Sequence, residues 1–220
     1  MTASSHPVLP DERLAAGAAR LAIRHRGRFS PETVQRLLVD SYTRLAVHAH
    51  VRTHLVVLAE RFAAESLDAL AHATNPAAGS GRPRVLFVCS HSAGRSQMAV
   101  ALLAHRAGDD VAVSSAGTHP ASAVDPQVLQ VLTESGGPLD EVYPKPLTDE
   151  VVQGADIVNT MGCGDGCPVL PGHRYLDWPV PEPDGAPIAV VRDIRDAIDT
   201  HITALLTELG AGPIRSPAVA

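Results

Sequence analysis

The stretch RVLFVCSHSAGRSQMA, residues 84–99, decides the fold. It opens with a short, uninterrupted hydrophobic run, which is typical of a strand buried on both faces of a parallel sheet. It closes with the start of a helical pattern that ends at Gly108. Between them lies a small loop with Cys89 at its start and Arg95 at its end. The pattern predicts a strand–loop–helix unit with Cys89 at the carboxyl end of the strand, where ligands bind in open α/β folds.

The segments that follow continue this alternation of strands and helices. Further strands are expected at residues 111–117, 156–161 and 173–178. Helices are expected at residues 125–136, 148–155 and 187–210. Asp125 is the predicted N-cap of the first of these, with Pro126 at its first position. Such alternation predicts an α/β domain with a parallel sheet.

The N-terminal third has a different pattern. Residues 1–75 contain three amphipathic helical segments, and Ser30 with Pro31 marks the start of the second. We expect a small three-helix bundle in this region. The Gly-, Pro- and Ala-rich residues 76–83 are predicted to be a linker, 84–212 the α/β domain and 213–220 a frayed tail.

Composition excludes several classes of function. The chain has 220 residues and a formal net charge of −6, so it has no basic excess for binding nucleic acid or a membrane surface. Its start lacks a signal-peptide pattern, and no apolar run is long enough to span a bilayer, so a cytoplasmic protein is expected. Three cysteines argue against a disulfide framework and for catalytic, redox or metal chemistry.

The loop from Cys89 to Arg95 has the composition of an oxyanion site. Backbone N–H groups and the helix N-terminus can cradle an anion, and the Arg95 guanidinium can bind two oxygens at once. The same field should favour the thiolate of Cys89, a nucleophile aimed at the bound anion, and Ser96 could donate a hydrogen bond to it. The predicted oxyanion-binding residues are Ser90, His91, Ser92, Ala93, Gly94 and Arg95. The alternative is an inert core cysteine at a strand end.

VLFVCSHSAGRSQMA (85–99) and SSAGTHP (114–120) resemble the phosphate loop and second strand of the low-molecular-weight tyrosine phosphatase superfamily. The RSQMA ending is more similar to its arsenate reductases than to its phosphatases. The resemblance covers residues 84 to about 210 and implies a flavodoxin-like, four-stranded parallel sheet. The superfamily usually has Asn three residues after the cysteine, where this chain has Ser92, and that Asn helps to hold the loop.

Cys163 and Cys167 lie in a Gly-rich loop after the predicted strand 156–161. Hydrolysis of a phosphate ester needs one cysteine, whereas reduction of a bound oxyanion can use two more for thiol–disulfide exchange. We expect Cys89 to attack arsenate, Cys163 to attack Cys89, and Cys167 to pass the disulfide to a reductant. The resemblance points to thioredoxin as that reductant, because thioredoxin-coupled members carry a cysteine pair in this loop, the second followed by proline. Phosphate or sulfate would compete with arsenate.

Four alternatives remain open at this stage. The cysteine pair could bind zinc with His173, although neither a metal nor a cofactor is expected. Cys89 could act alone with mycothiol and mycoredoxin, or with another small thiol, as the reductant. The protein could be a phosphotyrosine or small-phosphoester phosphatase. It could also be a regulatory protein that binds an oxyanion or a metalloid without turnover.

A carboxylic acid is expected in the Pro-rich loop before the last helix. The resemblance implies an Asp-Pro dipeptide whose carboxyl protonates the leaving oxygen, and the aligned pair here is Glu182-Pro183. Glu supplies the same carboxyl with one more methylene of reach. Asp177 and Asp184 could take its place, and the alternative is that Glu182 is an ordinary solvated loop residue.

Overall fold

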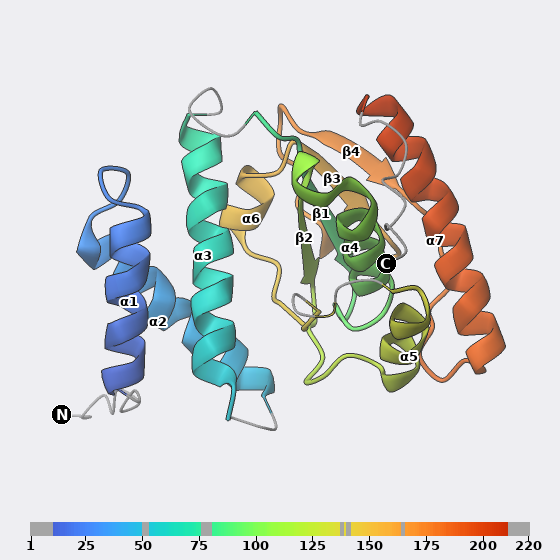
Figure 1. Cartoon of the computed structure of the whole chain (residues 1–220), viewed down its shortest axis with the longest axis horizontal. Helices are drawn as coiled ribbons and strands as arrows, with labels where there is room; N and C mark the ends of the chain where they lie inside the picture. The colour runs from blue at the N-terminus through green and yellow to red at the C-terminus, as the bar shows by residue number, and fades with distance from the viewer. Residues whose placement is uncertain are drawn as a thin grey trace, which may run out of the picture. The chain divides into compact units, whose positions relative to one another are not determined.

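The computed structural model of the chain describes residues 11–49, 53–75, 81–136, 139, 142–163 and 166–210 (Figure 1). Contacts between Cα atoms divide the chain into two compact units, Met1–Asp68 and Ala69–Ala220. The predicted tail, residues 213–220, and most of the predicted linker, residues 76–80, lie outside the described residues. None of the described helices is long and apolar enough to cross a membrane.

The first unit is helical, as the sequence predicts. It contains α1 (Asp11–Arg24), α2 (Pro31–His48) and most of α3 (Leu55–Thr74), whose last residues belong to the second unit. Ser30 caps α2, because its hydroxyl accepts a 3.2 Å hydrogen bond from the backbone N–H of Thr33. Large apolar side chains are buried every one or two turns, which gives each helix an apolar face: Leu14 and Leu21; Val34, Leu38 and Leu45; Leu55, Phe62 and Leu67.

The second unit contains a four-stranded sheet. Its strands are β1 (Arg84–Cys89), β2 (Ala112–Gly117), β3 (Ile157–Thr160) and β4 (Arg174–Asp177). Their order is β2-β1-β3-β4, and every pair is parallel. β1 is central and buried from Val85 to Cys89, which explains its unbroken hydrophobic sequence. The predicted flavodoxin-like α/β fold is therefore confirmed.

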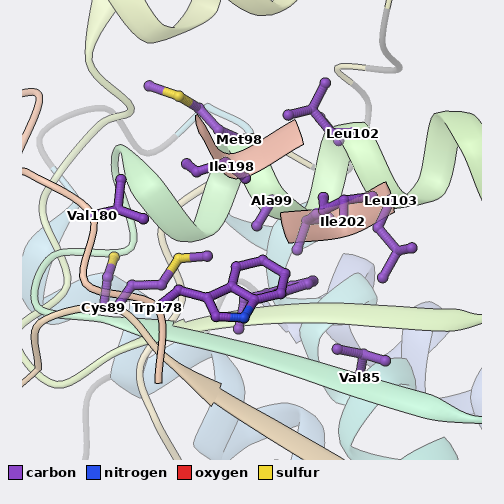
Figure 2. Packing of buried hydrophobic residues seen from close by; sticks show 14 of the residues in the cluster. Val85, Cys89, Met98, Ala99, Leu102, Leu103, Trp178, Val180, Ile198 and Ile202 are labelled. Carbon is purple, nitrogen blue, oxygen red and sulfur yellow. The ribbon is translucent and has the colours of Figure 1, made fainter. Parts of the chain in front are cut away.

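Helices complete this unit. They are α4 (Arg95–Ala107), α5 (Pro126–Glu134), α6 (Asp149–Gln153) and α7 (Ile188–Glu208), with a short 3-10 turn, η2 (Gly108–Asp110), after α4. Asp125 caps α5 by accepting a 2.7 Å hydrogen bond from the N–H of Gln127. The core combines β1 with α4 and α7, and Figure 2 shows the Trp178 ring among these side chains. Cys89 belongs to the same cluster, so its side chain is held by packed neighbours.

The strand register places the segments that carry the candidate site residues at one end of the sheet, beyond the carboxyl ends of its strands. Cys89 is in register with Gly117, Val88 with Thr160, and Thr160 with Asp177. Because all four strands are parallel, their carboxyl ends lie at the same end of the sheet, and the segments that follow them meet there. Those segments carry the loop 90–94, the connection 118–125, the cysteine segment and the Pro-rich loop with Glu182.

Candidate active site

The loop that follows β1 has its carbonyl groups turned outward. Each carbonyl from Cys89 to Gly94 accepts a hydrogen bond of 2.8–3.3 Å from the surrounding structure. The donors, in order, are the N–H groups of Thr118, His119 and Ala121, the side-chain amide of Gln97, and the N–H groups of Asp125 and Met98. In a trans peptide the N–H points opposite to its carbonyl. The N–H groups of residues 90–94 therefore face the inside of the loop, which is the arrangement of an anion-binding nest.

This loop crosses closely over the end of β2. A Cβ atom on Gly117 would lie 2.8 Å from the backbone nitrogen of Ser92 and 3.0 Å from the carbonyl oxygen of Ser90. Any side chain at Gly117 would thus push the loop away from the sheet. Gly117, in the SSAGTHP sequence of β2, is therefore required for the close approach of the loop that follows β1.

The thiol of Cys89 lies under the loop and is 2% exposed. Its Sγ is 3.1 Å from the hydroxyl oxygen of Ser96 and accepts a 3.3 Å hydrogen bond from the N–H of Ser92. The thiol also lies at the N-terminus of α4, which begins at Arg95. Hydrogen-bond donors and a helix N-terminus both stabilise the charged form of a thiol.

The guanidinium of Arg95 is buried beside the loop. One nitrogen, Nη1, donates a 3.2 Å hydrogen bond to the carbonyl of Val180, and Nη2 forms an ion pair with Glu182. Gly162 has a φ of 69° and passes so close that a Cβ there would overlap Nη1 of Arg95. Glu182, expected to be an acid, is thus within reach of the oxyanion loop and serves as the counter-ion of its arginine.

The two other thiols form a hydrogen-bonded pair at the carboxyl end of β3. The hydrogen bond from Cys167 lowers the pKa of Cys163 to about 7, and two backbone hydrogen bonds act in the same direction. The pKa of Cys167 is raised, first because it gives this hydrogen bond and then because of burial and nearby negative charge, including that of Cys89. Cys163 is therefore the nucleophile of the pair, and Cys167 is the partner that keeps its proton. Cys167 lies close enough to Cys89 for the two to interact electrostatically.

The remaining candidate acids are placed differently. Asp177 accepts a 2.6 Å hydrogen bond from the Thr160 hydroxyl and raises the pKa of both Cys163 and Cys167 by charge repulsion. Asp184 lies with Glu182 in the wall of a pocket of about 380 Å³. This pocket adjoins the oxyanion loop at His91, Ala93 and Gly94, and it is also lined by Ala121, Ala123 and Val124. It offers room for a group larger than an inorganic anion.

The zinc alternative has little support in the described part of the chain. His173 uses its Nδ1 for a 2.6 Å hydrogen bond with the carbonyl of Ala155. Within the described residues, no group of three or more His, Cys, Asp or Glu side chains is arranged to hold a metal ion.

Sequence reasoning missed the residues that support the loop from a distance. Gln97 is fully buried, and its amide nitrogen lies among four oxygen atoms, from Ser92, Ser115 and Tyr143. The one signal for Gln97 was its polar amide in a helix whose other residues are mostly apolar, because a buried amide needs hydrogen-bond partners. No local pattern indicated Gly162 or the carbonyl of Val180, because both meet Arg95 only in the folded chain.

The fold and this site together define a class of protein: a flavodoxin-like domain with a cysteine–loop–arginine oxyanion site after its first strand. The chain belongs to the low molecular weight phosphotyrosine protein phosphatase family, which it matches over residues 84–213. Residues 14–71 match a second family, described as the N-terminal domain of protein-tyrosine-phosphatase-like proteins. The predicted resemblance to this superfamily is therefore confirmed.

Relatives of the chain include enzymes with two different activities. A thioredoxin-dependent arsenate reductase of Corynebacterium glutamicum is 46% identical, with a TM-score of 0.82 over 92% of this chain and 98% of that one. A putative arsenate reductase of Halobacterium salinarum is 35% identical over 127 residues, 56% of this chain and 89% of the relative. An arginine phosphatase of Geobacillus stearothermophilus is 28% identical, with a TM-score of 0.51 over 58% of this chain and 93% of that one. The expected likeness to the arsenate reductases is confirmed.

Proposed function

We propose that the protein reduces arsenate to arsenite and that a dithiol protein of the thioredoxin type regenerates it. The observation that carries this proposal is the pair of further thiols, Cys163 and Cys167, beside a loop that already has its own thiol. Hydrolysis of a phosphoester has no use for Cys163 and Cys167, whereas a two-electron reduction ends with a disulfide. The similarity to a thioredoxin-dependent arsenate reductase along nearly the whole chain supports the same activity.

The first step uses the oxyanion loop. The inward N–H groups of residues 90–94 and the guanidinium of Arg95 bind arsenate, and the Cys89 thiolate attacks arsenic. A sulfur–arsenic bond forms, and one oxygen leaves as water after it takes up a proton. Arsenic is still pentavalent in this adduct, so no electrons have yet been transferred.

The second stage is a thiol relay. The thiolate of Cys163 attacks the sulfur of Cys89, a disulfide forms, and the sulfur–arsenic bond breaks with its electron pair on arsenic, which leaves as arsenite. Cys167 then loses its proton and attacks Cys163, which releases Cys89 as a thiolate. The Cys163–Cys167 disulfide is reduced by two thiols of the partner protein. The lowered pKa of Cys163 favours this order, because a thiolate is the attacking species.

Glu182 has two roles in this scheme. Its carboxylate forms an ion pair with Arg95, and an incoming oxyanion would compete for the same guanidinium. Once displaced and protonated, Glu182 can give its proton to the leaving oxygen. Glu182→Gln keeps an oxygen for Arg95 but has no acidic proton, so we expect arsenate binding to persist and adduct formation to slow about 100-fold. Asp184→Asn, in the same loop, is the matched control and should behave as wild type.

The test is arsenate-dependent NADPH oxidation in the presence of thioredoxin and thioredoxin reductase, with each cysteine changed to serine in turn. We expect all three variants to lose turnover. A single-turnover assay separates them: Cys167→Ser should release one equivalent of arsenite, and Cys163→Ser and Cys89→Ser none. Turnover by wild type only with mycothiol and mycoredoxin would contradict the relay. The absence of arsenite formation with any reductant would contradict the proposal as a whole.

A second candidate function is phosphatase activity, and the pocket beside the loop favours it. Its volume of about 380 Å³ would accommodate an organic leaving group next to the oxyanion site. In that case hydrolysis of p-nitrophenyl phosphate should depend on Cys89 and be unaffected by Cys163→Ser or Cys167→Ser. If Cys89→Ser is the only variant of the three that loses both phosphatase activity and arsenate reduction, one site carries out both reactions.

A further inference from the structure

Ser92 has the least favourable backbone conformation in the oxyanion loop. Its φ is 49°, and among the described residues it is the only one other than glycine with a positive φ. Serine has no intrinsic preference for this left-handed region, which glycine and asparagine enter more readily. Ser92 is also completely buried, so water does not stabilise its polar groups. Other parts of the protein must therefore hold it in this conformation.

The side-chain amide of Gln97 supplies this support. Its nitrogen is 2.8 Å from the carbonyl oxygen of Ser92, 3.0 Å from the Ser92 hydroxyl, 3.2 Å from the Ser115 hydroxyl and 2.7 Å from the carbonyl of Tyr143. Two of these neighbours are carbonyl oxygens, which only accept, so the amide must present its NH₂ group to them. The backbone N–H of Lys145 also donates to the Ser92 hydroxyl at 3.3 Å. One buried amide thus ties the loop to β2 and to the 143–145 segment.

The direction of the Ser92 carbonyl matters for anion binding. While Gln97 holds that carbonyl outward, the N–H of Ala93 on the same peptide group points inward. Rotation of this peptide would exchange the two and turn a carbonyl oxygen toward the bound anion. The hydrogen bond from Gln97 therefore sets the direction of this one peptide dipole of the loop.

We propose that Gln97 is a positioning residue that fixes the Ser92–Ala93 peptide in the orientation that binds an oxyanion. This inference rests on the proposed function of the loop as an oxyanion site. The hydrogen bonds of Gln97 go to Ser92, Ser115 and Tyr143, so we assign it an action through Ser92 and no direct role in the reaction. The proposal predicts that the need for Gln97 disappears when residue 92 can adopt the left-handed conformation unaided.

The test measures inorganic phosphate and arsenate binding through protection of Cys89 from iodoacetamide, in the chain with Cys163→Ser and Cys167→Ser. Gln97→Leu, which removes the donor, is expected to weaken phosphate binding and to raise the KM for arsenate in the intact enzyme about tenfold. Adding Ser92→Gly, or Ser92→Asn, to Gln97→Leu should restore most of the affinity. Met98→Leu, the next buried residue of α4, is the matched control and should change neither value.

The outcomes separate the inference from the proposed function. Phosphate binding by folded Gln97→Leu within twofold of wild type would overturn the inference, and so would a failure of both Ser92 substitutions to restore binding. If Gln97→Leu does not fold, the milder Gln97→Asn replaces it and should weaken binding by a smaller factor; wild-type binding by that variant would also overturn the inference. Wild type that is not protected by either anion would instead overturn the proposed oxyanion site itself.

Discussion

The hydrogen bond between the two loop thiols can be tested by removing its donor. Cys167 lowers the pKa of Cys163 from an ordinary value of 9.0 to about 7. In a Cys89→Ser background, Cys167→Ala removes the donor and leaves Cys163 as the only thiol, because the chain has three cysteines. Cys167→Ser keeps a hydroxyl donor at the same position and is the matched control.

The size of the effect follows from the two pKa values. At pH 7 a thiol with a pKa of about 7 is half ionised, and one with a pKa of 9.0 is about 1% ionised. The thiolate fraction thus falls about 50-fold, while the more basic thiolate is intrinsically about 6–10 times more nucleophilic. The alkylation rate of Cys163 at pH 7 should therefore fall about five- to eightfold in Cys167→Ala. In this variant the backbone hydrogen bonds to Cys163 still lower its pKa, while burial and the charge of Asp177 still raise it.

The assay is the rate of iodoacetamide labelling between pH 5 and 9, with the modified residue identified by mass spectrometry. With both loop thiols present, Cys163 should react first, with a midpoint near pH 7. The midpoint should move toward 9 in Cys167→Ala and much less in Cys167→Ser. An unchanged midpoint in Cys167→Ala would refute the argument, and labelling of Cys167 before Cys163 would reverse the order of the relay.

Three further predictions concern the site and the core. Gly162→Ala should weaken protection of Cys89 by phosphate tenfold or more, because the new Cβ would displace the Arg95 guanidinium and residue 162 has a positive φ. Protection equal to that of wild type would contradict this prediction. Ser96→Ala removes the hydroxyl 3.1 Å from the Cys89 sulfur and should slow alkylation of that thiol severalfold at pH 7, measured as above with the loop thiols changed to serine. Ile198→Ala leaves a cavity in the core cluster of Figure 2 and should lower the free energy of unfolding by about 2–5 kcal/mol in urea titrations; a loss below 1 kcal/mol would mean that the core collapses around it.

Most of the fold was predictable from sequence because its signals are local. The hydrophobic run of β1, the Asp125 cap before Pro126 and the long amphipathic α7 each lie within one segment. The short β4, which is at the edge of the sheet and only partly buried, also falls within a strand predicted from one segment, residues 173–178. The division into a helical region and an α/β domain followed from the change of pattern near residue 84 and remains a prediction as to its boundaries.

The candidate site was predictable in part. Cys89, Arg95 and the loop between them form one continuous motif, so their proximity could be predicted from the sequence. Glu182 could be named by analogy, but its ion pair with Arg95 joins residues 87 positions apart. The titration of Cys163 likewise depends on the fold of the loop that brings Cys167 to it, and C-x3-C spacing alone is compatible with a metal site or a disulfide.

By itself the sequence determined the order of strands and helices, the oxyanion loop and the presence of two further thiols, because these depend on neighbours within a few residues. Only the tertiary structure decided which way each peptide of that loop points. The left-handed conformation of Ser92 is maintained by Gln97 and by Lys145, which is 53 residues away. A weak local preference is overruled there by buried hydrogen bonds, whose strength depends on the exclusion of water. Such bonds exist only after the sheet and its helices have packed.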